Sequence, residues 1–258
     1  MRAQDLEPET EELLLRVVPD LANRWRGVTD SESDELEGLA GRPLPRFYRW
    51  FLSRMGADMG PLAFSTMDLG AAKLRAAYTE GAVRPDPRCL LIGWQSDEGM
   101  PLHLFYDFAH PGRDDARVVK RHLMGGPFHN QFETLREMLG WGALARFRVE
   151  TSAQRCVGLF GDTDDNDVVA HLAPIMKTLG FRTPVATGRY CGLYESPDAC
   201  LVTSAVPGDP PRFHVFRIGG VDPGRVRRIL GEITNSTSLE VEVKSWSPPS
   251  EPGASPSK

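Results

Sequence analysis

The segment Cys89–Phe108 constrains the fold of this 258-residue chain more than any other part. It begins with a continuous apolar run, Cys89–Trp94, which is expected for a strand covered on both faces. After a polar loop, residues along Leu102–Phe108 alternate in character, which is the period of a strand with two unlike faces. The segment therefore predicts two neighbouring strands of a sheet, and it contains no nucleophile-plus-base or metal-ligand pattern.

Helices are predicted on both sides of these strands. Several segments carry apolar residues at helical spacing together with residues typical of helix starts or stops. Examples are the candidate N-caps Thr29-Asp30-Ser31, the stop Gly41 and an opening Pro45. Pro19 should kink the first segment or begin a fresh helix. The predicted helices cover 14–25, 29–41, 45–56, 68–78 and 130–141.

The same half of the chain predicts two more strands. A short one falls at Leu62–Ser65, and Arg117–Leu123 should be the third strand of a meander that turns at His110-Pro111-Gly112. Helices, then a meander, then a covering helix indicate an α+β layer architecture with an antiparallel sheet.

These elements resemble the SUKH superfamily, which includes the yeast cell-wall-assembly regulator and many bacterial toxin-immunity proteins. The resemblance covers roughly residues 31–145. It rests on the order of four short matches: Leu44-Pro45, Ile92-Gly93, Tyr106-Asp107 and Phe132. The family often has a Gly-Asp pair before the aromatic strand, whereas this chain has Asp97-Glu98-Gly99-Met100-Pro101. The resemblance implies a SUKH-like fold and a protein that binds a partner without catalysis.

The second half of the chain predicts a separate unit. Its order is a strand, a helix, several strands, a helix and a last strand, which suggests a smaller α/β sandwich that is ferredoxin-like with an extra strand. Asp222 followed by Pro223 should begin its second helix. We therefore expect a SUKH-like domain at 1–149, a C-terminal domain at 150–246, and a disordered Pro/Ser-rich tail at 247–258.

Charge and composition indicate which classes of partner this chain can bind. A hydrophobic content of 41% and a charged content of 25% are typical of a soluble globular protein. The net charge of -5 argues against binding to nucleic acid and suits a basic protein partner. The acidic N-terminal residues do not resemble a signal peptide, and no apolar run reaches membrane-spanning length, so we expect a cytoplasmic protein.

The four cysteines agree with that expectation. They lack a C-x-x-C pair and form neither a disulfide framework nor a zinc knuckle pattern. Cys191 and Cys200 flank a predicted hairpin turn, so a disulfide between them is an alternative. Reduced core thiols are favoured in a reducing compartment.

Two clusters of side chains could carry chemistry. The acidic run 162–167 opens like a calcium loop but has Asp167 and Ala173 where such a loop needs Gly and Glu, so an acidic helix start is preferred. His103, Asp107 and His110 could form a metal or acid–base site, but hydrogen-bonded histidines are the default. No nucleotide, hydrolase or zinc-protease motif is present, and the sequence predicts no cofactor and no catalytic residues.

A partner-binding surface remains as the predicted site. Trp94, Asp97, Glu98 and Asp107 are expected on or beside the loop between the two central strands, as an acidic rim with an aromatic anchor. The alternative is that Trp94 is core and the carboxylates belong to a solvated turn. The leading hypothesis is an immunity protein that neutralises a cognate bacterial toxin. The others are a regulatory adaptor, whose C-terminal domain binds a ligand or dimerises, and an enzyme with a divergent site.

Overall fold

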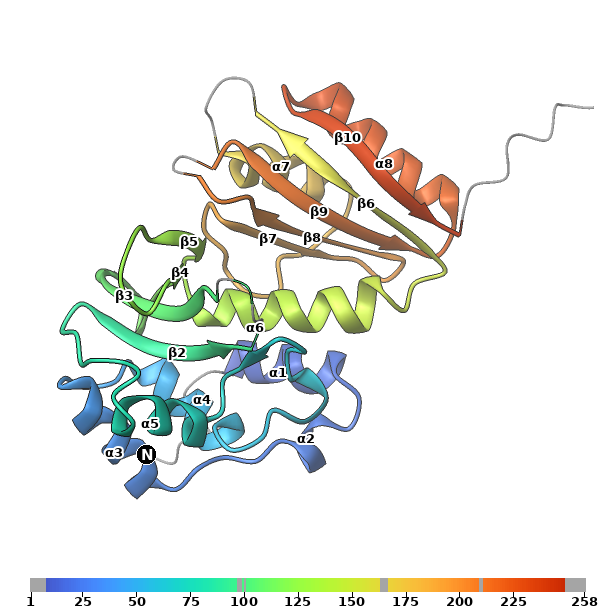
Figure 1. The fold of residues 1–258 in the computed structure, drawn as a ribbon. Coiled ribbons are helices and arrows are strands. Elements are labelled where there is room, and N and C mark those ends of the chain that lie inside the picture. The colour runs from blue at the N-terminus through green and yellow to red at the C-terminus, as the bar shows by residue number, and fades with distance from the viewer. Residues whose placement is uncertain (1–7, 97–98, 100, 163–166, 209–210, 249–258) are drawn as a thin grey trace, which may run out of the picture. The chain divides into compact units, whose positions relative to one another are not determined.

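The computed structural model describes residues 8–96, 99, 101–162, 167–208 and 211–248. The chain divides into two compact units, residues 1–142 and 143–258, each with helices packed on an antiparallel sheet (Figure 1). The α+β class expected from the sequence is confirmed. Within the described ranges, none of the helices combines the length and the apolar character needed to cross a bilayer.

The helices of the first unit begin and end where local signals predict. Asp20 adopts a left-handed conformation after Pro19, which divides the predicted helix at 14–25 into two. Thr29 forms a capping box with Glu32, and Gly41 ends the same helix with a φ of 66°. The helices are α1 (Pro8–Val17), α2 (Leu21–Arg24), α3 (Asp30–Ala40), α4 (Arg46–Met55), the 3₁₀ turn η2 (Gly60–Leu62), α5 (Ala71–Thr79) and α6 (Leu135–Leu144).

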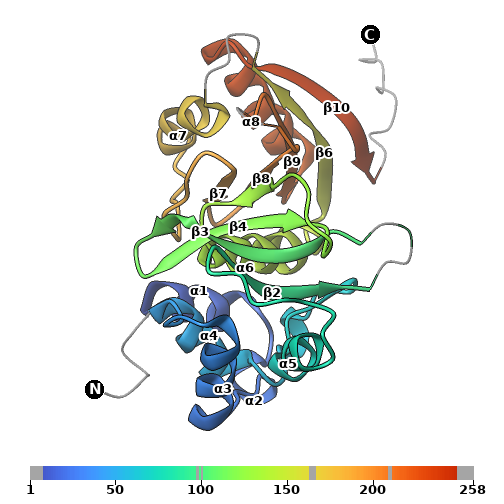
Figure 2. The same cartoon turned by 60° about the vertical axis from the view of Figure 1, so that its left-hand side comes forward.

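The first sheet has the strand order β1-β2-β3-β4-β5, so each strand pairs with its neighbours in sequence. Helices α4 and α5 pack on the sheet (Figures 1 and 2), and Tyr48 of α4 contacts the ring of Tyr106 edge-on at 5.3 Å. Helix α6 packs on the same face as α4, because Trp141 contacts Phe132, which lies in register with Val118 and Tyr106. The strands are β1 (Met67–Asp68), β2 (Cys89–Gln95), β3 (His103–Gly112), β4 (Asp115–Arg121) and β5 (His129–Phe132).

Three expectations for this sheet are wrong. The short strand predicted at Leu62–Ser65 is instead the end of η2 and a loop, and the strand follows at β1. The residues His110-Pro111-Gly112, predicted as a turn, belong to β3. The chain reverses after Gly112, at Asp114, whose φ is 55°. The first five residues of β3 are all buried, so both faces of this part of the strand are covered and the expected alternation is absent.

Strand β5 was missed because it occupies the start of the helix predicted at 130–141. The helix begins only at Leu135, after Thr134, whose hydroxyl accepts the backbone N–H of Glu137 at 3.3 Å. The backbone of β5 pairs instead with β4, where Asn130 lies opposite Val119. Apolar periodicity cannot reveal a pairing partner that lies in another strand.

A buried carboxylate connects β4 to α6. Asp115 is only 4% exposed, accepts the backbone N–H of Ala116 at 2.9 Å, and lies 3.4 Å from the Arg136 guanidinium. Burial raises the pKa of Asp115 to about 6, although Tyr106 and Arg136 act in the opposite direction.

The free energy of unfolding of the first unit should therefore fall as the pH rises from 4 to 6. In this window folded Asp115 keeps its proton while the unfolded chain releases it, so the folded state loses up to about 3 kcal/mol relative to the unfolded state. Urea unfolding of wild type and Asp115→Asn at pH 4.5 and 7 measures this. The difference between the two proteins should shift in favour of the variant at the higher pH, and a pH-independent difference would contradict the prediction.

The second unit has the strand order β10-β6-β9-β8-β7 and the element order βα, strands, αβ. This is the ferredoxin-like arrangement with β7 as an additional edge strand, as the sequence predicts. Helices α7 and α8 share one face of the sheet (Figure 2) and bury Leu172 and Ile229 against Phe216. The elements are η3 (Ala145–Val149), β6 (Gln154–Gly161), α7 (Val168–Thr178), β7 (Cys191–Glu195), β8 (Ala199–Ala205), β9 (Phe213–Gly220), α8 (Pro223–Ser236) and β10 (Glu240–Ser247).

The division between the units falls at 142–143, inside α6, whereas the sequence places it at 149–150. The physical reason is that α6 runs directly into the π-helical turn η3. Its buried residues Ala145 and Val149 belong to the segment that contacts β8 and β9, so the end of the helix packs with the second sheet. The tail predicted from residue 247 lies outside the described residues from 249 onward.

Local signals also hold in the second unit. Asp222 caps α8 by accepting the N–H of Arg225 at 2.8 Å. In the β7–β8 hairpin Cys191 lies opposite Ser204 and Cys200 opposite Glu195, so the two cysteines do not face each other. All four cysteines are described and buried, and no disulfide joins any two of them.

Candidate functional site

The predicted site residues do not form one surface. Trp94 lies near the end of β2, where it pairs with Asp68 of β1. Asp107 lies opposite Cys89, at the start of β2 and the far end of the hairpin. Asp97 and Glu98 lie outside the described residues. The structure therefore separates Asp107 from Trp94 and from the connecting loop.

Trp94 is half-buried rather than a core residue. Its ring packs against His103 with 4.3 Å between centroids, and the Lys73 ammonium lies 4.6 Å from the ring centroid. The His103 ring is held in place because its Nδ1 accepts the backbone N–H of Gln95 at 3.2 Å. Trp94 is thus a fixed aromatic side chain at the β1 edge of the sheet.

Asp107 is a buried ion-pair partner and not part of an acidic rim. Its two oxygens each accept a hydrogen bond from Arg88 at 3.0 Å, and His110 Nδ1 lies 3.0 Å away. Burial by itself raises the pKa of Asp107, but the hydrogen bonds from Arg88, the Ala109 N–H and His110 outweigh it and lower the pKa to about 2. Asp107 therefore stays ionised and joins the chain before β2 to β3.

Of His103, Asp107 and His110, the structure brings only Asp107 and His110 into contact. His110 and Asp107 are in contact, which orients one ring nitrogen of His110 outward as in an acid–base pair. His103 contacts Trp94 instead. Within the ranges that the structure describes, no hydroxyl or thiol hydrogen-bonds to His110, and no group of three or more His, Cys, Asp or Glu could hold a metal ion.

The acidic run 162–167 begins a helix where it can be seen. Asp167 is the N-cap of α7 and accepts the N–H groups of Val169 and Ala170, as the preferred interpretation expects. Residues 163–166 of the run lie outside the described residues.

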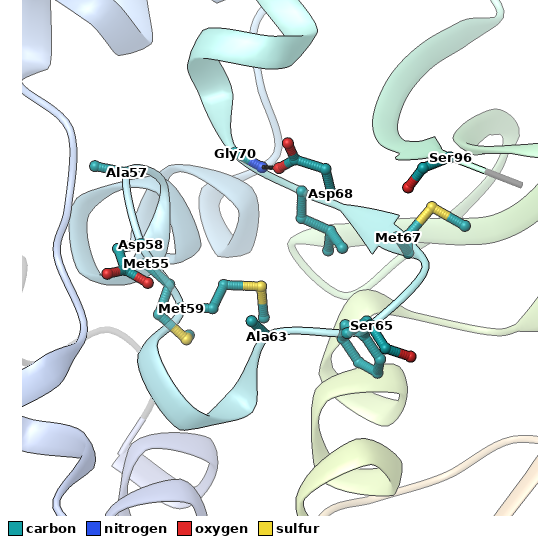
Figure 3. A pocket seen from close by; sticks show the side chains of 12 residues that line it. Met55, Ala57, Asp58, Met59, Ala63, Ser65, Met67, Asp68, Gly70 and Ser96 are labelled. Carbon is teal, nitrogen blue, oxygen red and sulfur yellow. Dashed lines mark hydrogen bonds between the residues drawn. The ribbon is translucent and has the colours of Figure 1, made fainter.

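A pocket opens between the end of α4 and the β1–β2 edge (Figure 3). Its lining residue Asp68 lies opposite Trp94 in the β1–β2 pair. Its cavity volume is about 220 Å³. The buried part of the lining is apolar and comes largely from methionine, with Met55, Met59, Met67 and Leu69. The exposed part carries Asp58, Asp68, Ser65 and Ser96, and Ser96 is the residue that leads into the loop containing Asp97 and Glu98.

The two aspartates are held by the same local motif. Asp58 accepts the N–H of Gly60 at 2.7 Å, and Asp68 accepts the N–H of Gly70 at 2.8 Å, the latter marked in Figure 3. Both are Asp-x-Gly turns in which a side-chain oxygen mimics a backbone acceptor. Gly60 has a φ of 56°, a conformation that other residues rarely adopt. Each turn uses Oδ1 of its aspartate and leaves Oδ2 for another donor.

The pocket is negatively charged. Neither Asp58 nor Asp68 forms an ion pair with any described residue, and no Lys or Arg is among the residues that line the cavity. Methionine side chains are flexible and polarisable, so they adapt to an apolar guest. The arrangement can take a group with an apolar stem and a positively charged end.

Sequence reasoning missed this site, although a signal was present. The strings Asp58-Met59-Gly60 and Asp68-Leu69-Gly70 repeat one motif ten residues apart. Each alone is typical of an ordinary turn, and the second fell within a predicted helix. Tertiary contacts bring them together: the pairing of β1 with β2 places Asp68 beside Trp94, and the hydrogen bond from the Ala71 N–H to the Gly56 carbonyl holds the end of α4 next to it.

Searches against protein-family models, curated proteins and solved structures find no match to this chain, so its function has to be argued from these residues.

Proposed function

We propose that this chain is a non-catalytic protein-binding module that captures a basic partner by taking one of its Lys or Arg side chains into the pocket between Asp58 and Asp68. The observation that carries the proposal is the pair of carboxylates, both without a basic partner among the described residues, above an apolar lining. The net charge of -5 favours approach of a basic protein.

The size of the pocket supports a side chain rather than a free ligand. Small-molecule sites usually measure about 300–1,000 Å³, and this cavity is smaller, at about 220 Å³. Lys and Arg bury their aliphatic stems against apolar surface while the charged end keeps polar partners. Here Met55 and Met59 would contact the stem, and Asp58 and Asp68 would accept hydrogen bonds from the charged end.

Trp94 supports the same surface as an interface. Tryptophan is enriched among residues that dominate binding energy, and a rigid ring loses little entropy on binding. Trp94 is half-buried and already fixed by His103, and it lies on the strand next to Asp68. In the sequence, Asp97 and Glu98 follow Ser96 directly and add two negative charges to this part of the chain.

The SUKH resemblance supports a bacterial toxin as the partner. Within this proposal the chain is a cytoplasmic immunity protein, and the basic partner is the toxic domain of a bacterial toxin, such as a nuclease. An acidic immunity protein can neutralise such a toxin through charge complementarity alone, without any reaction.

Co-expression tests this function. Cells that express a toxin encoded beside this gene should survive when the chain is present and die when it is absent, and the two purified proteins should form a complex. A toxin that is degraded or chemically modified by the chain, rather than bound intact, would contradict a non-catalytic role; mass spectrometry of the recovered toxin distinguishes these results.

A further inference from the structure

A second and larger pocket lies at the opposite end of β2. It is lined by the loop 81–87, by Cys89 and Phe105 of the sheet, and by the segment 121–125, which begins at the last residue of β4. Its cavity volume is about 580 Å³, within the range of about 300–1,000 Å³ that is usual for small-molecule sites. The proposed protein-binding function makes no use of it.

The charged residues of this pocket are mainly basic. Arg84, Arg121 and His122 line it together with one carboxylate, Asp86. Burial raises the pKa of the Cys89 thiol to about 11, so the thiol is neutral near pH 7 and adds no negative charge. Two arginines and one aspartate give the lining a surplus of one positive charge.

Arg121 is held rigidly but is incompletely paired. Its guanidinium lies 4.7 Å from the ring centroid of Phe128, and its Nη1 lies 3.6 Å from Asp86, which is beyond a good hydrogen bond. Its Nε is buried and has no hydrogen-bond partner among the described residues. One oxygen of Asp86 already accepts the N–H of Arg88 at 2.8 Å. Nη1 also donates a long hydrogen bond to Cys89 Sγ at 3.8 Å. The contacts to Asp86 Oδ2 and to Cys89 are both long, so the fixed guanidinium keeps hydrogen-bonding capacity at its outer nitrogens for an anion.

His122 supplies a second donor. Its Nδ1 accepts the backbone N–H of Met124 at 3.2 Å, so in the neutral ring the proton is on Nε2. An N–H of this kind donates to an anionic oxygen. Arg121 and His122 are consecutive in the chain, and both line the cavity.

The remaining wall is apolar. Val83 and Phe105 are buried at the pocket, and Pro85 and Leu123 complete the apolar lining. Met124 is 89% exposed at the rim, on a segment that continues into Gly125 and Gly126 with φ values of 96° and 111°. A large apolar side chain at the rim of a small-molecule pocket gains burial when an apolar guest is present.

We propose that this pocket binds a small monocarboxylic acid with an apolar body, with its carboxylate on Arg121 and His122 and its body against Val83 and Phe105. A single negative charge matches the net charge of the lining. A dianionic phosphate would leave charge uncompensated beside Asp86, and a zwitterionic amino acid would compete with Arg121 for that carboxylate.

Isothermal titration calorimetry of the full chain with sodium benzoate tests this inference. Benzoate should bind with saturation and one-to-one stoichiometry, and inorganic phosphate and L-phenylalanine should bind at least about tenfold more weakly. Arg121→Gln should weaken benzoate binding about tenfold or more, because a charge-assisted hydrogen bond is lost. Arg113→Gln is the matched control, since Arg113 is exposed and does not line the pocket.

A second variant keeps the test decisive if Arg121→Gln does not fold. Ala82 is exposed and lines the pocket, so Ala82→Phe should fill the cavity and abolish benzoate binding with the fold retained. No saturable benzoate binding, unchanged affinity in Ala82→Phe, or tighter binding of phosphate would overturn the inference. None of these results depends on Asp58 or Asp68, so the proposed protein-binding function is tested separately.

Discussion

Replacing Asp58 and Asp68 together by asparagine should weaken binding of the basic partner by about 100-fold and leave the free energy of unfolding almost unchanged. Asparagine keeps the side-chain oxygen that accepts the N–H of Gly60 or Gly70, so both turns are preserved. Only the negative charge is removed. A hydrogen bond to a charged group contributes about 1.5–3 kcal/mol against about 1 kcal/mol for a neutral pair, and two such losses give this magnitude.

The matched control removes the same charge elsewhere in the first unit. Glu12 and Glu80 are exposed and do not line the pocket, so Glu12→Gln with Glu80→Gln changes the net charge equally. Surface plasmon resonance with the partner at two salt concentrations compares the variants. If both double variants lose affinity equally, general charge and not the pocket carries the binding.

Gly158→Ala should destabilise the second unit by about 3 kcal/mol or more. A Cβ at this position of β6 would lie 2.1 Å from the Glu242 carbonyl oxygen and 2.6 Å from the Phe216 ring. The obstacle is partly backbone, so relief requires β10 to move away from β6, the strand it pairs with. Urea unfolding of wild type and variant, followed by far-UV circular dichroism, measures the difference in the free energy of unfolding.

Gly231→Ala in the same unit should stabilise it, in contrast to Gly158→Ala. Gly231 lies inside α8, and a Cβ there meets no atom within 4 Å. Alanine should raise the free energy of unfolding by roughly 0.5–1 kcal/mol because it restricts the unfolded chain and favours a helix. A tolerated Gly158→Ala would mean that β10 does not hold the register seen in the structure.

The structure divides the predicted partner-binding surface, because Trp94 and Asp107 do not lie together. Trp94 and Asp107 were expected on one acidic rim, but the antiparallel register of β2 and β3 places them at opposite ends of the hairpin. Asp107 is neutralised by Arg88, whereas Asp58 and Asp68 form no ion pair with any residue that the structure describes. The carboxylates available to a partner are therefore ones that the sequence analysis did not select.

The sequence by itself determined the features that depend on contacts within a few residues. The capping box of Thr29, the left-handed Gly41 and the Asp222 cap are each set by groups at most three residues apart, so the residue types suffice to predict them. The α+β class and the ferredoxin-like order of the second unit follow from such elements in series. Strand β5 was not predictable in this way, because its hydrogen bonds go to β4.

Only the tertiary structure decided which polar residues are available for binding. Whether a carboxylate is free depends on what lies across the sheet: Arg88 reaches Asp107 from the strand start, and nothing comparable among the described residues reaches Asp68. The pocket forms where the Ala71 N–H donates to the Gly56 carbonyl at 2.8 Å, which holds the turn after α4 next to the turn before α5, while β1–β2 pairing supplies the other wall. Sequence periodicity reports which face of an element is apolar, but not which neighbour covers it or which charge that neighbour brings.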